Sequence, residues 1–265
     1  MNFGLKAVVL AAGKGKRLQT KDSDAPKVMR EACGKPLLWH VLDALSFIPS
    51  KDIIIVVGYK KEEVIKRFGS YAYAVQHEQL GTGHAVMSAA EGLSGFRGDV
   101  LVCFGDMPAI RRGTYEALID AHKRQGNDCT ILTGESEIPL AYGRILRDGS
   151  GGFMHVVEEK DCTADQLGIK ELNTGVFVFR SPLLLDALKL IKNDNAQGEY
   201  YLTDVPGVMK AGGAKIGVFK RDIGDEMLGV NTLEHLGMIE EILMRDAGGK
   251  DIGYRVQDLG VFIAF

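Results

Sequence analysis

A glycine-rich loop that directly follows an apolar run constrains the fold of this chain most. Residues 7–10 read Ala-Val-Val-Leu, a run with β-branched residues and no polar face. Such a run is typical of a strand buried on both sides. Gly13-Lys14-Gly15-Lys16-Arg17 follows, so two glycines and three cations share one loop. Its backbone N–H groups can approach a ligand closely, which suits a polyphosphate, although an ordinary solvated turn explains this fragment equally well.

Strands and helices alternate through the first half of the chain. Apolar runs predict strands over residues 52–58, 71–75, 99–104 and 127–133. The segments between and after them predict helices over 37–47, 61–68, 85–91 and 112–125. This alternation predicts a mostly parallel sheet with right-handed crossovers. From about residue 139, short strands and turns replace the alternation and predict a small β-rich extension over one side of the first sheet, to which we assign the strand over 172–179.

Composition excludes several classes of protein. The chain has 265 residues, of which 46% are hydrophobic, enough for the core of one large α/β domain or two small ones. Its net charge of −3 provides no general field for nucleic acid. The four cysteines form no Cys-x-x-Cys pair, which argues against a zinc site or a disulfide framework. Without a secretory signal or an apolar stretch long enough for a bilayer, we expect a soluble, cytoplasmic protein with no membrane partner.

A second glycine loop, QHEQLGTGHA at residues 76–85, leads into a predicted helix that Thr82 can cap. Gln76 and Gln79 can offer donors and acceptors to a planar base edge, and the backbone at Gly81 can approach that base. Loops at the carboxyl ends of parallel strands are where open α/β sheets bind ligands. Two such loops in one sheet favour nucleotide binding over plain strand–helix connections.

Several other polar residues lie at the ends of predicted strands or before helices. Asp106 follows the strand over 99–104 and suits Mg²⁺ next to phosphates, or it hydrogen-bonds its own turn. Asn231 is a candidate neutral metal ligand or a helix N-cap. Glu158 and Asn173 end strands of the extension, where they can bind hydroxyls or simply face solvent. No Walker loop, dinucleotide fingerprint or Gly-x-Ser-x-Gly elbow occurs.

Taken together, these motifs resemble those of the sugar-nucleotide pyrophosphorylases. The opening follows the pattern LAAGxGxRL…PK over residues 10–18 and 26–27. The chain is most similar to the uridylyltransferase domain of the bacterial bifunctional N-acetylglucosamine-1-phosphate uridylyltransferases. This likeness rests on blocks in family order at residues 76–85, 105–108, 142–145, 157–161, 171–175, 195–204 and 229–231.

The resemblance implies a nucleotide-diphospho-sugar transferase type A fold, which is a Rossmann-like, mostly parallel sheet flanked by helices, with a small β-rich sugar-binding extension. It implies a nucleotidyltransferase domain over 1–245, with a nucleotide-binding part over about 1–135 and a sugar-binding part over about 136–232. Residues 246–265 would form a tail where the bifunctional enzymes begin a β-helix with acetyltransferase activity. Whether the chain is naturally short, and its oligomeric state, stay open.

The resemblance also implies a reaction. The family transfers uridylyl from UTP to N-acetylglucosamine 1-phosphate in an Mg²⁺-dependent, in-line displacement that releases pyrophosphate. Arg17 would neutralise the departing pyrophosphate and Lys27 would hold the phosphates near the α-phosphorus. The implied nucleotide-binding residues are Leu10, Ala11, Ala12, Gly13, Gln76, Gln79, Gly81 and Thr82, the sugar-binding residues are Gly143, Glu158, Asn173, Thr174 and Tyr201, and the metal ligands are Asp106 and Asn231.

One region departs from the family pattern, since the bifunctional enzymes usually carry a second Asn or Asp in the region after Asn231, where this chain has Thr232-Leu233-Glu234-His235. Two alternatives also stay open. The same chemistry on another sugar 1-phosphate or with another nucleoside triphosphate fits the motifs. A non-catalytic regulatory subunit that binds a sugar nucleotide is the alternative from a different class, although the presence of Arg17, Lys27 and Asp106 weighs against it.

Overall fold

The computed structural model describes residues 4–15, 18, 24–136 and 140–247. Its strands are β1 (Leu5–Ala11), β2 (Glu31–Ala32), β3 (Lys35–Pro36), β4 (Ile53–Val57), β5 (Ala72–Val75), β6 (Asp99–Phe104), β7 (Cys129–Gly134), β8 (Arg144–Arg147), β9 (Phe153–Val157), β10 (Leu172–Arg180) and β11 (Ile216–Lys220). Its α-helices are α1 (Leu37–Ala44), α2 (Lys61–Phe68), α3 (Thr82–Ser88), α4 (Ala90–Leu93), α5 (Arg112–Gln125), α6 (Ala164–Leu167), α7 (Ser181–Leu188), α8 (Val205–Ala211) and α9 (Leu233–Asp246).

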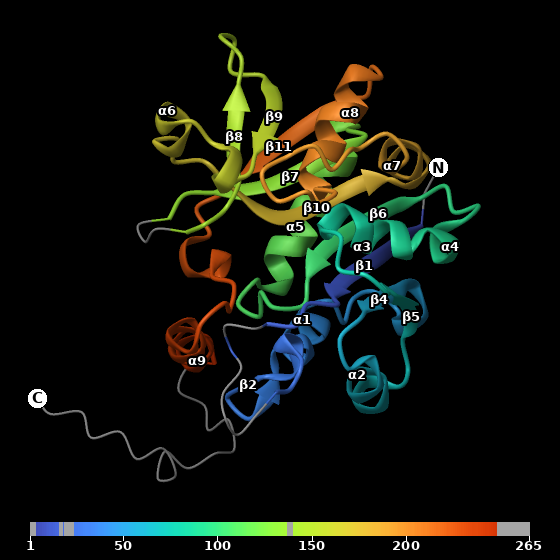
Figure 1. The fold of residues 1–265 in the computed structure, drawn as a ribbon, viewed down its shortest axis with the longest axis vertical. Helices are drawn as coiled ribbons and strands as arrows, with labels where there is room; N and C mark the ends of the chain where they lie inside the picture. Colours follow the sequence, from blue (N-terminus) through green and yellow to red (C-terminus); the bar gives the residue numbers. More distant parts are fainter. Residues whose placement is uncertain (1–3, 16–17, 19–23, 137–139, 248–265) are drawn as a thin grey trace, which may run out of the picture.

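Within the described residues, one large sheet runs through the molecule in the order β11-β7-β10-β6-β1-β4-β5 (Figure 1). β1 pairs in parallel with β4 and with β6, and β4 pairs in parallel with β5. β7 and β11 are also parallel to each other. β10 is antiparallel to both of its neighbours, β6 and β7. The sheet is therefore mixed but mostly parallel, and the predicted fold class is confirmed.

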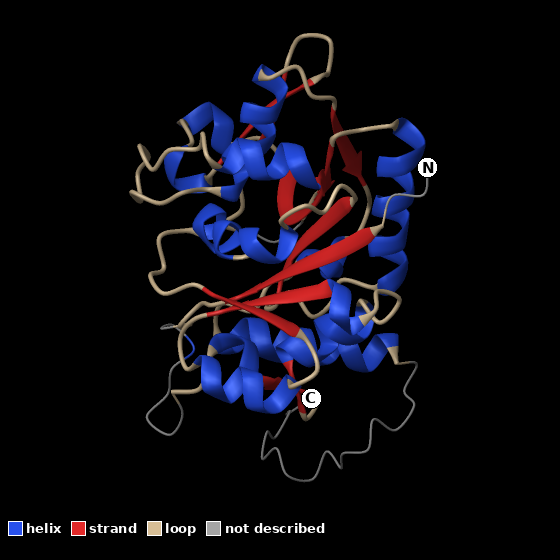
Figure 2. Cartoon of the chain, turned by 90° about the vertical axis from the view of Figure 1, so that its right-hand side faces the viewer, coloured by secondary structure: helices blue, strands red, loops and turns tan. Residues whose placement is uncertain are grey.

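Helices cover both faces of this sheet (Figure 2), because its central strands carry apolar side chains in both directions. In β1, Ala7, Val9 and Ala11 enter a core shared with α1, α2, α5 and α9. Val8 and Leu10 enter a second core on the opposite face, shared with α3, α4, α7 and α8. All five side chains are at most 7% exposed. The opening run is thus a strand buried on both sides, as predicted.

The strand β10 lies in a different place from the one predicted. We expected residues 172–179 in the β-rich extension, whereas β10 lies in the middle of the main sheet between β6 and β7. Only the β8–β9 hairpin, which pairs with β10 through Leu172 and Arg144, projects beyond the main order of strands. The predicted nucleotide-binding and sugar-binding parts therefore share one sheet, and the division between them stays a prediction about function.

None of the helices in the described part of the chain combines the length and apolar character that a membrane crossing requires.

The central position of β10 generates a prediction about stability. Phe179 is fully buried and its ring stacks on Phe177, with ring centroids 5.3 Å apart. Phe179→Ala should lower the free energy of unfolding by about 3–5 kcal/mol, because it leaves a cavity at the centre of the sheet. Leu190→Ala is the control, since this side chain is 65% exposed. Urea denaturation followed by circular dichroism measures both, and equal losses would contradict the central role of β10.

Candidate functional site

A cleft lies at the carboxyl ends of the parallel strands, where the strand order reverses beside β1. The next strand of the main sheet, β4, lies on one side of β1, and the later β6 lies on the other. Such a switch point is the usual ligand position in open α/β sheets. The cleft consists of a first cavity of about 300 Å³ and a second cavity of about 230 Å³. Thr82, Phe104 and Asp106 line both cavities, so the two adjoin.

The first cavity lies between the two glycine loops. The predicted site residues that line it are Leu10, Ala11, Ala12, Gly13, Lys27, Gln76, Gln79, Gly81, Thr82 and Asp106. The cavity thus brings together every nucleotide-binding residue that we predicted. Arg17 lies outside the described residues. Gly15, Val28, Ala85, Phe104 and Glu199 also line the cavity, and none of them was assigned as a binding residue, although Gly15 belongs to the predicted phosphate loop.

Gly13 and Gly15 of the opening loop lack a side chain for different structural reasons. Gly15 has a φ of +62°, and a Cβ there would lie 2.7 Å from the Cβ of Lys27. Glycine is therefore required where the loop passes over Lys27. A Cβ on Gly13, in contrast, would meet nothing within 4 Å. Because Gly13 lines the first cavity, its missing side chain leaves space there for a ligand.

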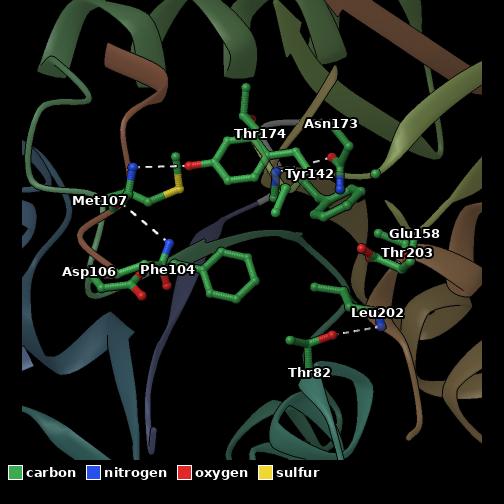
Figure 3. Close-up of a pocket in the computed structure, with 16 residues that line it drawn as sticks. Thr82, Phe104, Asp106, Met107, Tyr142, Glu158, Asn173, Thr174, Leu202 and Thr203 are labelled. Carbon is green, nitrogen blue, oxygen red and sulfur yellow. Dashed lines mark hydrogen bonds between the residues drawn. The ribbon is translucent and has the colours of Figure 1, made fainter. Parts of the chain in front are cut away.

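The second glycine loop is held by a segment from the other half of the chain. The backbone N–H of Gly83 donates to the carbonyl of Tyr200 at 2.7 Å, and the N–H of Tyr200 donates to that of Leu80 at 2.8 Å. Thr82 is not the N-cap of α3, contrary to our expectation, because Gly81 takes that position. The Thr82 hydroxyl instead accepts a hydrogen bond from the Leu202 N–H at 3.0 Å (Figure 3).

Lys27 lies where the two cavities meet, between the two predicted metal ligands. Its ammonium forms an ion pair with Asp106 and donates to the Asn231 side-chain oxygen at 2.8 Å. The side chains of Lys27 and Asp106 are only 15% and 19% exposed. The N-cap of α9 is Thr232, whose hydroxyl accepts from the His235 N–H. Asn231 is therefore not used as a cap, and its oxygen is directed at a cation.

This cluster fits a divalent metal that also binds phosphate. Asp106 and Asn231 present hard oxygen donors, which suit Mg²⁺, and in this structure those oxygens already hold one cation, the Lys27 ammonium. No group of three or more His, Cys, Asp or Glu side chains in the described part of the chain is arranged to hold a metal. A Mg²⁺ ion held by Asp106 and Asn231 would complete its coordination with water and phosphate oxygens, as this ion commonly does.

The second cavity is lined by residues of β6, β10 and the β8–β9 hairpin region. Of the predicted sugar-binding residues, it is lined by Gly143, Glu158, Asn173 and Thr174 (Figure 3). The Asn173 side-chain oxygen accepts from the Gly175 N–H at 3.1 Å, and its Nδ2 has no partner in the described part of the chain. The Thr174 hydroxyl donates to Leu132 and accepts from Val176, so one lone pair is left for a ligand.

Tyr201 is the predicted sugar-binding residue that the cavity does not include. Its ring is 5% exposed, and its hydroxyl accepts from Gln197 at 2.9 Å. The next residues, Leu202 and Thr203, line the cavity instead. A direct contact between Tyr201 and a ligand in this cavity is therefore not supported by the geometry.

Glu158 is half-buried at the end of β9, and the Thr203 hydroxyl donates to it at 2.8 Å. Burial raises the pKa of the Glu158 carboxyl above its ordinary value, while the hydrogen bond from Thr203 acts in the opposite direction. Nearby carboxylates, including Asp204, raise the pKa further. The carboxyl group is thus costly to ionise in this cavity and gains from a ligand that donates hydrogen bonds to it.

Several residues that line this cavity were not predicted, and the structure gives a clear role to Tyr142, Phe104 and Thr203 among them. The Tyr142 hydroxyl donates to the Met227 carbonyl at 2.6 Å and accepts from the Gly229 N–H at 2.9 Å, which ties the cavity wall to the segment before Asn231. Burial holds the pKa of Tyr142 well above its ordinary value. Phe104 lines both cavities, and the Thr203 hydroxyl donates to Glu158. Tyr142 and Thr203 fall within motif blocks that we recognised without assigning these residues a role, whereas Phe104 looks like any apolar strand residue.

The comparisons with known proteins identify the fold as that of a nucleotidyltransferase. The chain aligns over 96% of its length with a crystal structure of a Bacillus anthracis protein assigned as a glucose-1-phosphate thymidylyltransferase, at a TM-score of 0.70, covering 98% of that protein with 18% sequence identity. This likeness concerns the fold. The family model of the MobA-like NTP transferase domain matches residues 7–169. The chain belongs to this nucleotidyltransferase family.

Curated relatives are similar over a longer stretch. The chain is 44% identical over 239 residues to the bifunctional protein GlmU of Lactobacillus delbrueckii subsp. bulgaricus, which is 90% of this chain and 51% of that protein. It is 44% identical over 263 residues to the bifunctional protein GlmU of Thermoanaerobacter pseudethanolicus, which is 98% of this chain and 55% of that protein. The chain thus spans about half the length of the curated relatives it matches.

The position of Lys27 generates a prediction about metal affinity. Lys27→Met should strengthen the binding of Mn²⁺ to the nucleotide-free protein roughly tenfold, about 1.4 kcal/mol, because it frees the oxygens of Asp106 and Asn231 from a competing cation. Asp106→Asn should weaken it. Electron paramagnetic resonance of free Mn²⁺ measures the affinity. Lys14→Met removes an equal charge from an exposed position of the opening loop, and an equal effect of the two lysine variants would contradict the prediction.

Burial of Glu158 generates a prediction about pH dependence. Because the pKa is raised in the folded protein, ionisation of Glu158 subtracts from stability as pH rises through that pKa, and subtracts nothing below the ordinary value of 4.5. Glu158→Gln keeps an acceptor for Thr203 and should raise the free energy of unfolding at pH 7.5. The gain should shrink as pH falls toward 4.5. Urea denaturation across this pH range measures the free energy of unfolding. Glu241→Gln is the control, because it removes a carboxylate from an exposed position.

Proposed function

We propose that this chain transfers the uridylyl group of UTP to N-acetylglucosamine 1-phosphate, forming UDP-N-acetylglucosamine and pyrophosphate. The observation that carries the proposal is the pair of adjoining cavities that meet at Lys27, Asp106 and Asn231. Two adjoining cavities that meet at a lysine and at two oxygen donors suited to Mg²⁺ would suit phosphoryl transfer between a nucleotide and a sugar phosphate. The motif resemblance and the identity of 44% to proteins named GlmU support the choice of substrates.

The reaction needs no protein nucleophile. An oxygen of the sugar 1-phosphate would attack the α-phosphorus of UTP, the bond from this phosphorus to the oxygen bridging to the β-phosphate would break, and pyrophosphate would leave with that oxygen. Positioning and charge neutralisation supply most of the catalysis in such transfers. The cleft suits this requirement because it holds both substrates on one rigid sheet.

Charged residues at the junction of the cavities would take separate roles. Lys27 would hold phosphate oxygens once its ammonium leaves Asp106 and Asn231. Those two residues would hold Mg²⁺, which when bound neutralises phosphate charge. Arg17, on the basis of the motif alone, would neutralise the departing pyrophosphate. The separation of a metal position from a lysine position therefore depends on a movement of the Lys27 side chain when ligands bind.

The first cavity would hold the nucleotide. The backbone from Leu10 to Gly13 would lie along it at the end of β1. Gln76 and Gly81 would contact uracil, with Gln79 and Thr82 beside them. Gln76 is well suited to this role because its side chain is 4% exposed and yet lines the cavity. A buried amide of this kind discriminates strongly, since a wrong base would leave it without a hydrogen-bond partner.

The second cavity would hold the sugar. Asn173 offers the unpartnered Nδ2 donor to a carbonyl such as that of an acetamido group, and Glu158 offers acceptors to sugar hydroxyls. A side chain at Gly143 would collide with Val156, so the backbone there forms the wall directly. Thr174 would contribute shape and one lone pair. Tyr201 would act indirectly, through the neighbouring Leu202 and Thr203. A cytoplasmic location stays a prediction.

An assay of pyrophosphate release tests this proposal. With UTP, Mg²⁺ and N-acetylglucosamine 1-phosphate, we expect turnover that Asp106→Ala reduces at least about 100-fold, because a metal ligand and the partner of Lys27 are lost. Asp120→Ala, on the exposed surface of α5, is the matched control. Circular dichroism must show that both variants fold.

A panel of other sugar 1-phosphates and nucleoside triphosphates, compared by kcat/KM, identifies the preferred substrates. A higher kcat/KM for a different pair would replace the proposed substrates within the same chemistry. Tight binding of the sugar nucleotide without turnover of any pair would instead indicate a regulatory subunit.

A further inference from the structure

The amide of Gln76 is held by two partners in the wall of the first cavity. Its Nε2 lies 3.0 Å from the carbonyl oxygen of Gly81 and 3.2 Å from Nδ1 of His84. An amide nitrogen carries two hydrogens, so these partners use both. The Gln76 backbone is fixed as well, since its N–H donates to Val57 at 2.8 Å. The side chain has therefore no free donor to offer a ligand.

The orientation of this amide follows from the chemistry of its partners. A carbonyl oxygen can only accept, so the Gln76 nitrogen and not its oxygen must face Gly81. His84 must then accept through Nδ1, which places the imidazole proton on Nε2. The Gln76 oxygen has no partner in the described part of the chain. It is the polar atom that Gln76 has left for a ligand in the cavity that it lines.

Gly81 completes the pattern with a donor. Its N–H has no acceptor within the described residues. Glycine is required at this position, because its φ is +111° and a Cβ there would lie 2.6 Å from the Tyr200 carbonyl oxygen. Its own carbonyl also accepts from the Ala85 N–H of α3 at 3.1 Å. The loop therefore presents one fixed acceptor, on Gln76, and one fixed donor, on Gly81.

This pair matches an imide edge. Uracil and thymine offer an N3–H donor flanked by carbonyl acceptors, whereas cytosine offers an N3 acceptor beside an amine donor. Guanine also offers a donor beside an acceptor, but it has two rings and so differs from uracil in size as well. Uracil and cytosine are of equal size, so a comparison of these two bases measures the contribution of the Gln76 amide alone. We propose that His84 is a positioning residue that acts with the Gly81 carbonyl to hold the Gln76 amide with its oxygen toward the base, and thereby strengthens the preference for uracil over cytosine.

This inference rests on the proposed function, because it concerns which base the nucleotide cavity takes. His84 would not itself touch the base, since it is absent from the lining of the cavity. A purely structural role would be filled by any side chain of similar size. A positioning role needs an acceptor at Nδ1. In Asn, the side-chain oxygen is the same number of bonds from the backbone as Nδ1 is in His, so Asn keeps an acceptor near that position. Leu has a shape similar to that of Asn but has no acceptor.

Calorimetric titration of the folded protein with UTP and with CTP tests the inference without turnover. We expect the wild type to bind UTP more tightly than CTP. In His84→Leu the ratio of the UTP affinity to the CTP affinity should fall roughly 3–10-fold, whereas His84→Asn should keep the wild-type ratio. Urea denaturation should show similar stability for the two variants. An unchanged ratio in His84→Leu, or equal losses in both variants, would overturn the role of His84.

The same titration separates the two proposals. If the wild type does not prefer UTP to CTP, the proposed uridylyltransferase function fails, whatever the variants do. If it prefers UTP and His84→Leu keeps that preference, only the inference about His84 fails. An independent readout is the tautomer, since ¹⁵N–¹H correlation spectra at pH 8 should show His84 with its proton on Nε2. A proton on Nδ1 would also overturn the inference.

Discussion

The ammonium of Lys27, held between Asp106 and Asn231, is the interaction on which the site depends. It joins the segment after the opening loop, the end of β6 and the turn before α9, which are far apart in the sequence. A carboxylate removed from most solvent requires a counter-charge, and breaking such a pair leaves one charge uncompensated. The same oxygens suit a metal ion. Under the proposed function, the ion pair that organises the cleft without ligands is thus also the one that substrates would rearrange.

The placement of β10 connects the two cavities. Its register against β7 shifts between Asn173 and Phe177, and Gly175 within this irregularity has a φ of +79°. A side chain at Gly175 would collide with Phe104, the ring that lines both cavities. The irregular part of β10 carries Asn173 and Thr174 into the second cavity, while its regular part pairs with β6. A single antiparallel strand therefore places Asn173 and Thr174, which we propose to contact the sugar, next to the first cavity at the ends of the parallel strands.

Local sequence patterns predicted much of this structure. β6, α2 and α5 begin and end at the predicted residues, because β6 is a continuous apolar run, the two helices are amphipathic, and polar or glycine residues flank each element. The cavities also collect most of the predicted site residues, since those lie at the carboxyl ends of neighbouring strands. The position of β10 was not predictable in this way, because an apolar run does not specify which distant strand it pairs with. Thr82 was predicted as a cap and instead binds Leu202, a contact across the fold that no local pattern encodes. Phe104 and Tyr201 illustrate the same limit, since the direction of a side chain depends on packing.

The segment from Tyr200 to Thr203 has a thermodynamic consequence. At one end it hydrogen-bonds the loop of Leu80, Thr82 and Gly83 beside the first cavity, and at the other it supports Glu158 in the second. If a ligand in one cavity binds more tightly to one position of this short segment, it therefore also changes the ligand affinity of the neighbouring cavity. Linkage requires such an influence to be equal in both directions, so the factor by which a nucleotide changes sugar affinity equals the factor by which the sugar changes nucleotide affinity.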